Sequence, residues 1–389
     1  MREFSPDPKP RFVDPDRLDR IRRSIDGSSL DGYIAFSPEN SYYLSGTYAG
    51  MYSRPVAGLV TSEESLFFGP YLERRKAART AWTDRGLVFE DQDDPFELLG
   101  DAVNDTGATT LGYDAAEAPP GWVDALDAAT DAELVDATDR LLTLRATKTD
   151  WEIDLMRKAS DLATAGMEAY LERVGSGVPE IEVVRAIQDA YYDTYLDHHP
   201  EYDIGTANEL GQYGFASVLS GDHALEPHSL SSARPIADGE AVVGIALPSI
   251  QGYVCEEERT VLVGDVPSHI ESAMETLVDV REQAMEKMGP GVPTADVDKE
   301  TGDALRAAGY GENIIHRTGH GEGITIHEGP AMNASSPEGA LEPGMVMSVE
   351  PGLYFEDDDV ALRHSDTFVI TESGAERLTD TPAGVHRVD

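Results

Sequence analysis

The chain has 389 residues, of which 73 are acidic and 30 basic, and its formal net charge is -43. This length predicts two ordinary domains, each with its own core. Because 40% of the residues are hydrophobic, far too many for a disordered acidic tail, we expect a folded protein with an acidic surface. Such a charge opposes binding to phosphate backbones, so nucleic acid is not an expected partner.

The charge excess also indicates the environment of the protein. High ionic strength screens repulsion between acidic residues, so the composition indicates a halophilic protein from a salt-rich cytoplasm. The single cysteine, Cys255, cannot form an intramolecular disulfide. The N-terminus lacks the apolar core of a signal peptide, and no stretch approaches the roughly 18 apolar residues of a membrane span. We therefore expect a cytoplasmic protein that does not bind membranes.

Residues 1–143 predict a small α/β domain. Asp14 and Pro15 are typical of a helix cap and a first helical position. Ile21 and Ile25 follow at helical spacing. Short apolar runs then alternate with turns, as expected of strands. These runs span residues 32–36, 56–60, 65–68 and 110–113.

Residues 144–389 predict a larger domain of the α+β class. Thr149 and Glu152 form a capping-box pattern that predicts the start of a long helix. A second helix is expected from Pro179, with Ile181 on its apolar face. Strands are expected at residues 215–219, 241–247 and 259–263.

The same order of elements then recurs along the chain. Helices are expected at residues 267–288 and 294–308, and strands at residues 345–349 and 367–371. Two successive units of a helix pair followed by strands predict an internally duplicated domain. We expect its helices to pack on one face of a mostly antiparallel sheet.

Four segments carry a histidine or a carboxylate beside a predicted strand or in a glycine-rich turn. Their central residues are His228, Glu258, His320 and Glu350. A lone histidine in a loop, such as His228, is more typical of a surface residue than of a site. His320 lies between glycines, which leave its imidazole accessible, and Glu350 ends a predicted strand. Only the combination of the four indicates a reactive pocket.

The acidic run at residues 256–258 has two interpretations. In so acidic a chain, such a run is ordinarily solvated. In a strand, however, Glu256 and Glu258 share one face and can both point inward. Two buried like charges need a cation, a metal or a shared proton. His327, seven residues after His320, is expected beside the reactive groups rather than among them.

Together these segments resemble the pita-bread family that includes Xaa-Pro peptidases, methionine aminopeptidases and creatinase. Residues 37–46 resemble the N-terminal domain of Xaa-Pro peptidases, and residues 318–321 and 349–352 resemble their core motifs. The resemblance implies a creatinase/prolidase-type α/β domain over residues 1–143 and a pita-bread catalytic domain over residues 144–389.

Peptidases of this family bind two divalent metals through two aspartates, one histidine and two glutamates. The resemblance places this set on Ile245, Glu256, His320, Glu350 and Ser365. Ile245 has no donor atom, and Ser365 is a poor, neutral ligand for a hard cation. A two-metal mechanism is therefore not expected. We favour no cofactor, and the alternative is one ion of manganese, cobalt or zinc on the three remaining ligands, Glu256, His320 and Glu350.

Creatinase, the family member that works without metal, is similar to the chain around Tyr253 and Glu258. Its catalytic histidine falls on His228. Its substrate clamp, an aromatic residue and an arginine, falls on Tyr52 and Arg54. The resemblance therefore implies that Tyr52, Arg54 and Tyr253 contact the substrate, and we expect the same of His327. The second substrate-binding arginine of creatinase falls near Ala331, so creatine itself is not the expected substrate.

The favoured hypothesis is metal-independent hydrolysis of a C–N bond in a small, zwitterionic amide, amidine or ureide. His228 would transfer the proton, and Glu258 and Glu350 would stabilise developing charge. Arg54 would pair with a substrate carboxylate in the neighbouring subunit's pocket, which implies a homodimer. The first alternative is a metal-dependent Xaa-Pro aminopeptidase or dipeptidase with an altered metal site. The second is a non-catalytic pseudo-enzyme that binds a small molecule or a partner.

Overall fold

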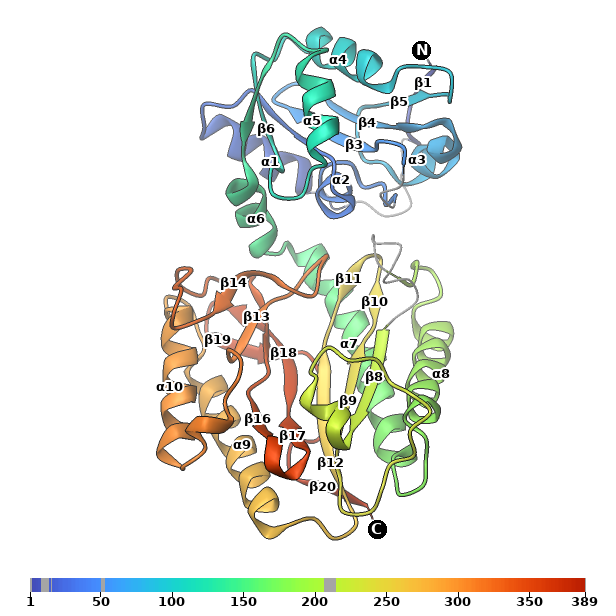
Figure 1. The fold of residues 1–389 in the computed structure, drawn as a ribbon. Helices are drawn as coiled ribbons and strands as arrows, with labels where there is room; N and C mark the ends of the chain where they lie inside the picture. Colours follow the sequence, from blue (N-terminus) through green and yellow to red (C-terminus); the bar gives the residue numbers. More distant parts are fainter. Residues whose placement is uncertain (1, 8–13, 15, 50–52, 206–214, 389) are drawn as a thin grey trace. The chain divides into compact units, whose positions relative to one another are not determined.

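The computed structural model describes residues 2–7, 14, 16–49, 53–205 and 215–388. The chain divides into two compact units, and the boundary lies between Arg145 and Ala146 (Figure 1). None of the helices in the described ranges has the length and apolar character needed to cross a membrane.

The N-terminal unit contains a mixed sheet. Within the described residues it has seven strands, in the order β1-β5-β4-β3-β2-β6-β7. Strand β2 pairs antiparallel with β3 and parallel with β6, and the consecutive strands β4 and β5, and β6 and β7, pair parallel as βαβ connections require. The strands are β1 (Arg2–Phe4), β2 (Gly32–Ala35), β3 (Ala57–Thr61), β4 (Ser65–Pro70), β5 (Arg85–Phe89), β6 (Thr110–Tyr113) and β7 (Glu133–Asp136).

Helix α1 begins later than the sequence predicts. It starts at Arg17, with Asp16 as the N-cap residue, and the predicted first position, Pro15, lies outside the described residues. Asp14 accepts a hydrogen bond from Arg17 Nε at 3.1 Å, so the carboxylate holds a buried arginine. The helices of this unit are α1 (Arg17–Asp26), α2 (Pro38–Ser45), α3 (Arg74–Thr80), α4 (Pro95–Asp105), α5 (Pro120–Asp127) and α6 (Thr138–Ala146).

The helices of the second unit follow the predicted pattern. The capping box is confirmed, because Glu152 N donates to Thr149 Oγ1 at 3.3 Å and Thr149 N donates to Glu152 Oε2 at 2.7 Å. Ile181 is an exception, since it is exposed while Val184 and Ile187 carry the buried face. The helices are α7 (Asp150–Arg173), α8 (Glu180–His198), α9 (Ser268–Lys287) and α10 (Thr294–Ala307).

The sheet of the second unit is antiparallel apart from one edge contact, as predicted. Within the described residues it has nine strands, seven of them in the order β14-β13-β15-β18-β12-β9-β8. Strand β19 pairs with β18, and β20 pairs parallel with β12. The strands are β8 (Phe215–Ser220), β9 (Ala241–Leu247), β12 (Glu257–Val263), β13 (Gly319–Gly321), β14 (Glu328–Met332), β15 (Val346–Val349), β18 (Ser365–Thr371), β19 (Gly374–Arg377) and β20 (His386–Val388).

Two short hairpins complete the unit. They are formed by β10 (Ser249–Ile250) with β11 (Tyr253–Val254), and by β16 (Gly352–Phe355) with β17 (Val360–Arg363). In Figure 1, α7 and α8 lie beside β8 and β9, while α9 and α10 lie beside the later strands. This grouping fits the two predicted helix-pair-and-strand units.

Helix α7 packs closely against one face of the sheet of the second unit, so a cavity can form only on the other face. A Cβ atom on Gly244 would lie 2.6 Å from the ring of Tyr170 in α7, so only glycine fits there. Because side chains alternate along a strand, the next residue, Ile245, points to the opposite face. That face carries the site.

Candidate active site

Side chains from β9, β12, β18, β15 and β13 meet on the face opposite α7. The register pairs Ile245 with Glu258, and Glu258 with Ser365. Farther along the sheet, His320 is paired with Ser348. Paired residues share one face of a sheet. A hydrogen bond of 2.8 Å between the Ser348 and Ser365 hydroxyls connects the His320–Ser348 pair to the residues paired around Glu258.

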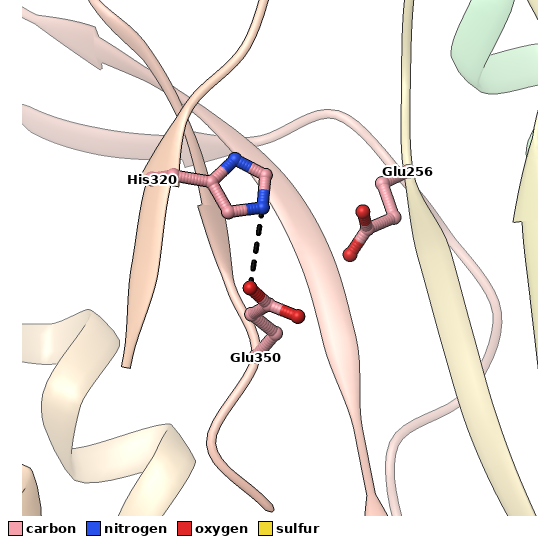
Figure 2. A group of neighbouring side chains, drawn as sticks. All are labelled: Glu256, His320 and Glu350. Atoms are coloured by element: carbon pink, nitrogen blue, oxygen red, sulfur yellow. Dashed lines mark ion pairs between the residues drawn. The ribbon is translucent and has the colours of Figure 1, made fainter. Parts of the chain in front are cut away.

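Glu256, His320 and Glu350 form the centre of this group (Figure 2). His320 Nε2 lies 3.2 Å from Glu350 Oε1. Burial alone would lower the pKa of His320, but hydrogen bonding and charge from Glu350 outweigh it and raise the pKa to about 9. Burial would raise the pKa of Glu350, but His320 lowers it to about 2. The two side chains therefore form an ion pair at neutral pH.

The three side chains fit one divalent metal ion. Each of Glu256, His320 and Glu350 offers one donor atom, and these atoms lie within 4.8 Å of one another. Burial, followed by the charge of Glu350, raises the pKa of Glu256, so the site favours added positive charge. Three protein ligands with an open position are typical of a catalytic metal site.

The same site does not fit two metal ions. Ile245 contributes only carbon atoms to the cavity. Ser365 is fully buried, and its hydroxyl contacts Ser348, which in turn donates to Glu256 Oε1 at 3.2 Å. Neither residue supplies the negative oxygen that a second hard cation needs.

Glu258 lies directly opposite Ile245 and introduces a carboxylate on the neighbouring strand. Its Oε2 lies 2.7 Å from Nε of Arg363, and both side chains are buried. Burial raises the pKa of Glu258 well above its usual range, despite the positive charge of Arg363. Burial alone would lower the pKa of Arg363, but Glu258 and the other acidic groups around the guanidinium together outweigh burial and raise it. The pair is therefore a second polar group beside the metal-ligand group, and its favoured charge is the positive one of Arg363.

A cavity of about 450 Å³ lies over these residues. This volume is within the range of small-molecule sites, roughly 300–1,000 Å³. Part of its wall is apolar, which suits an apolar part of a substrate. The apolar lining residues are Phe215, Ile245, Leu247, Ile315 and Ile326.

The cavity brings together most of the residues predicted from the sequence. His228, Glu258, His320, His327 and Glu350 all line it. The ring centroids of His320 and His327 lie 4.4 Å apart, and those of His327 and His228 lie 6.2 Å apart. Burial and the positive charge of His320 lower the pKa of His327 to about 4, so His327 is neutral at neutral pH.

Of the three other predicted substrate contacts, one lies outside this cavity, one belongs to the N-terminal unit, and one is not among the described residues. Tyr253 is buried outside the lining, and its hydroxyl donates to Glu152 Oε1 at 2.6 Å. Arg54 belongs to the N-terminal unit and donates to both carboxylate oxygens of Asp91, at 2.8 and 3.1 Å. Tyr52 lies outside the described residues.

The sequence analysis did not identify Arg363, His316 and Arg317 as site residues. All three line the cavity, and His316 Nε2 lies 3.1 Å from the Tyr354 hydroxyl. Their positions in the sequence could have indicated them, because His316 and Arg317 shortly precede the glycine-flanked His320. Arg363 lies two residues before Ser365.

Comparison with protein families gives two matches that follow one another along the chain. The model of metallopeptidase family M24 matches residues 154–372. The model of the creatinase/prolidase N-terminal domain matches residues 17–147.

Relatives and solved structures cover almost the whole chain. The chain is 28% identical to the Xaa-Pro dipeptidase of Pyrococcus furiosus, over 94% of this chain and 98% of that protein. It is 31% identical to the probable dipeptidase PepE of Mycobacterium tuberculosis, over 91% of each. The crystal structure of a prolidase from Pyrococcus horikoshii has a TM-score of 0.81 and 25% identity, covering 95% of this chain and 99% of that chain. Dipeptidase PepE from Mycobacterium ulcerans has a TM-score of 0.80 and 27% identity, over 96% and 97%.

Proposed function

Because the chain belongs to metallopeptidase family M24, we propose that it hydrolyses the peptide-type C–N bond of a small, dipeptide-like substrate with one divalent metal ion. The expected family and the two-domain α+β, pita-bread fold are confirmed by both family matches and the structural neighbours. The sequence-based preference for a metal-independent, creatinase-like reaction finds no support in relatives that carry the name Xaa-Pro dipeptidase. The peptidase alternative therefore becomes the main proposal.

The observation that carries this proposal is the convergence of Glu256, His320 and Glu350 in one cavity. A divalent ion held there supplies Lewis-acid polarisation of a substrate carbonyl. Binding of the ion would require His320 to lose its proton, because only neutral imidazole is a ligand. The carboxylates of Glu256 and Glu350 would compensate the added charge.

The other residues of the cavity have separate roles in the proposal. His228 is exposed and lines the cavity, so its imidazole can carry a proton between solvent and the leaving nitrogen. Neutral His327 lies between the rings of His228 and His320 and can orient the substrate by hydrogen bonding. The contact of Arg363 with Glu258 holds the Glu258 carboxyl group in place at the cavity wall.

The proposal is tested by assaying Xaa-Pro dipeptides together with metal content. Substitution Glu350→Gln removes one ligand charge, so both the bound metal and the hydrolysis rate are expected to fall. Glu312→Gln is the matched control, because Glu312 is exposed and lies outside the cavity. Normal metal content and activity in Glu350→Gln would rule out this site.

Metal-free C–N hydrolysis is the second candidate function. It is favoured by Ile245 and Ser365, and by the His320–Glu350 pair, which is already neutralised without a cation. In this case His228 would act as the general base, and Glu258 and Glu350 would hold a cationic or amidine-like carbon. Full activity in the presence of a strong chelator, on amides, amidines or ureides, would establish it over the metal-dependent reaction.

The assembly and environment of the protein are further parts of the proposal. We infer a homodimer and a high-salt cytoplasm from the resemblance and the net charge of -43. Light scattering coupled to size-exclusion chromatography measures the first. The dependence of the melting temperature on salt concentration measures the second.

A further inference from the structure

Arg317 is a cation in the wall of the cavity, and it has no charged partner within the part of the chain that the structure describes. Two arginines line the cavity, and Arg363 is paired with Glu258 at 2.7 Å. Among the residues that the structure describes, no ion pair or hydrogen bond involves the guanidinium of Arg317. In a chain with 73 acidic and 30 basic residues, a half-buried arginine without a carboxylate partner is unexpected.

Arg317 lines the same cavity as the reactive residues. Its charge contributes to lowering the pKa of His327, after burial and the charge of His320. His327 itself lies beside His320. Arg317 also lines a second cavity, together with residues of α10, and the neighbouring residues Ile315 and His316 likewise line both cavities. The side chain therefore borders open space and is free to receive a ligand.

The charges of the cavity restrict what this ligand can be. Glu350 is paired with His320, and Glu258 with Arg363, while Glu256 has a raised pKa. His320 and Arg363 are thus already paired with carboxylates of the protein, so an anionic group of the ligand needs a further cation. Arg317 is the lining cation that is available for this purpose among the described residues.

The positions first considered for a carboxylate contact are less suited to it. Arg54 already donates two hydrogen bonds to Asp91. Position 331 holds an alanine, which has no charge.

We propose that Arg317 binds the free carboxylate of the substrate, so that the cavity accepts dipeptide acids and discriminates against the corresponding carboxamides. The inference rests on the proposed function and names the substrate class of that site. A guanidinium binds a carboxylate through two parallel hydrogen bonds, which a neutral carboxamide cannot match. The apolar wall formed by Ile245, Leu247 and Phe215 accommodates the apolar side chains of such a dipeptide.

The test measures binding and does not depend on turnover. The probe is a Leu-Pro analogue with a ketomethylene group in place of the peptide bond, prepared as the free acid and as the carboxamide. Isothermal titration calorimetry on the wild type is expected to show about 10- to 100-fold tighter binding of the acid. Arg317→Gln is expected to abolish this preference by weakening the acid alone, with an unchanged melting temperature.

Arg306→Gln is the matched control. Arg306 lines the neighbouring cavity, is exposed, and pairs with Asp303 at 3.0 Å, so its substitution is expected to leave the acid preference intact. The inference is overturned if the wild type shows no acid preference or does not bind the acid. It is also overturned if Arg317→Gln retains the preference or weakens both probes equally.

The two proposals fail in different ways. An Arg317-dependent acid preference in a protein that cleaves no dipeptide would refute the hydrolysis and leave the carboxylate contact standing. Cleavage of Leu-Pro with the same KM in Arg317→Gln as in the wild type would refute the carboxylate contact and leave the hydrolysis standing.

Discussion

The two faces of β12 and β18 both carry buried charges, but only one of them lines a cavity. Glu256 and Glu258 lie on the cavity face, whereas Glu257 and Arg259 lie on the face toward the helices. On the helix face, Arg259 Nη2 lies 3.0 Å from Glu257 Oε1 and 2.9 Å from Asp366 Oδ1. The alternation of a single strand thus separates acidic residues into a structural group and a reactive group.

The two groups differ in how their charges are compensated. Arg259 also donates to the main-chain oxygens of Glu258, Ser365 and Thr381, so the protein itself satisfies the guanidinium. Burial raises the pKa of Glu257 on the helix face, as it does those of Glu256 and Glu258, but Glu256 and Glu258 line the cavity and Glu257 does not. The carboxylates of the helix face are therefore paired with a buried arginine of the protein, whereas those of the cavity face are accessible to an additional cation.

The largest expected effect comes from removing the cation of the helix face. Arg259→Met leaves Glu257 and Asp366 buried without this partner, which is expected to cost about 3–5 kcal/mol of unfolding free energy. Urea denaturation followed by circular dichroism measures the change. An unfolding free energy equal to that of the wild type would show that the helix-face cluster is not structural.

Substitution on the cavity face is expected to affect activity and not stability. Glu256→Gln removes a carboxylate that burial and Glu350 already make costly to ionise, so the melting temperature should stay the same or rise. Mutation of residues that hydrogen-bond to metal ligands lowers metal affinity or activity by about 10- to 100-fold. Loss of Glu256, a direct ligand in the proposal, should therefore lower the hydrolysis rate by at least about 100-fold. A large fall in melting temperature would remove the distinction between the faces.

A double substitution should allow the cavity face to bind a second metal ion. Ile245→Asp with Ser365→Glu places two carboxylates beside the existing ligands, in the positions that the two-metal peptidases use. The metal content should rise by about one ion per chain, measured by inductively coupled plasma mass spectrometry. Asp alone at Ile245, without the Ser365 change, is the control, and an unchanged content in the double variant would show that the site cannot accommodate a second ion.

The smallest expected effect is the pH dependence of the metal-free protein. The pKa of His320 is raised to about 9, so its contribution to stability is complete below pH 6.5 and is lost as the pH rises through about 9. The pKa of Glu350 is lowered to about 2, so its contribution is complete above pH 4.5 and is lost as the pH falls through about 2. The unfolding free energy of the wild type should therefore exceed that of His320→Gln by the largest amount between about pH 4.5 and 6.5. An advantage independent of pH would exclude the ion pair.

Strong periodic patterns allowed much of the fold to be predicted. Strands β6 and β9 have the predicted bounds, and α7 starts at its capping box. Strand β12 begins at Glu257, two residues before the predicted start, because acidic residues that normally favour solvent are buried and paired there. Strand β13 was missed, since its sequence Gly319–Gly321 is typical of a turn and forms a strand only between its two partners.

The site was predicted in part for a similar reason. His320 and Glu350 belong to recognisable motifs, and the alternation of Glu256 and Glu258 could be derived from strand geometry alone. The contact of Glu258 with Arg363 depends on register and tertiary packing, which no local pattern contains. The same holds for Arg317, whose significance lies in the partners around it.

Metal content measured together with activity tests the central claim most directly. The protein is purified without added chelator, analysed by mass spectrometry for divalent metals, and assayed on Leu-Pro before and after removal and return of the metal. We predict about one ion per chain, loss of hydrolysis on removal and recovery on return. Two ions per chain, or full hydrolysis by metal-free protein, would contradict the account.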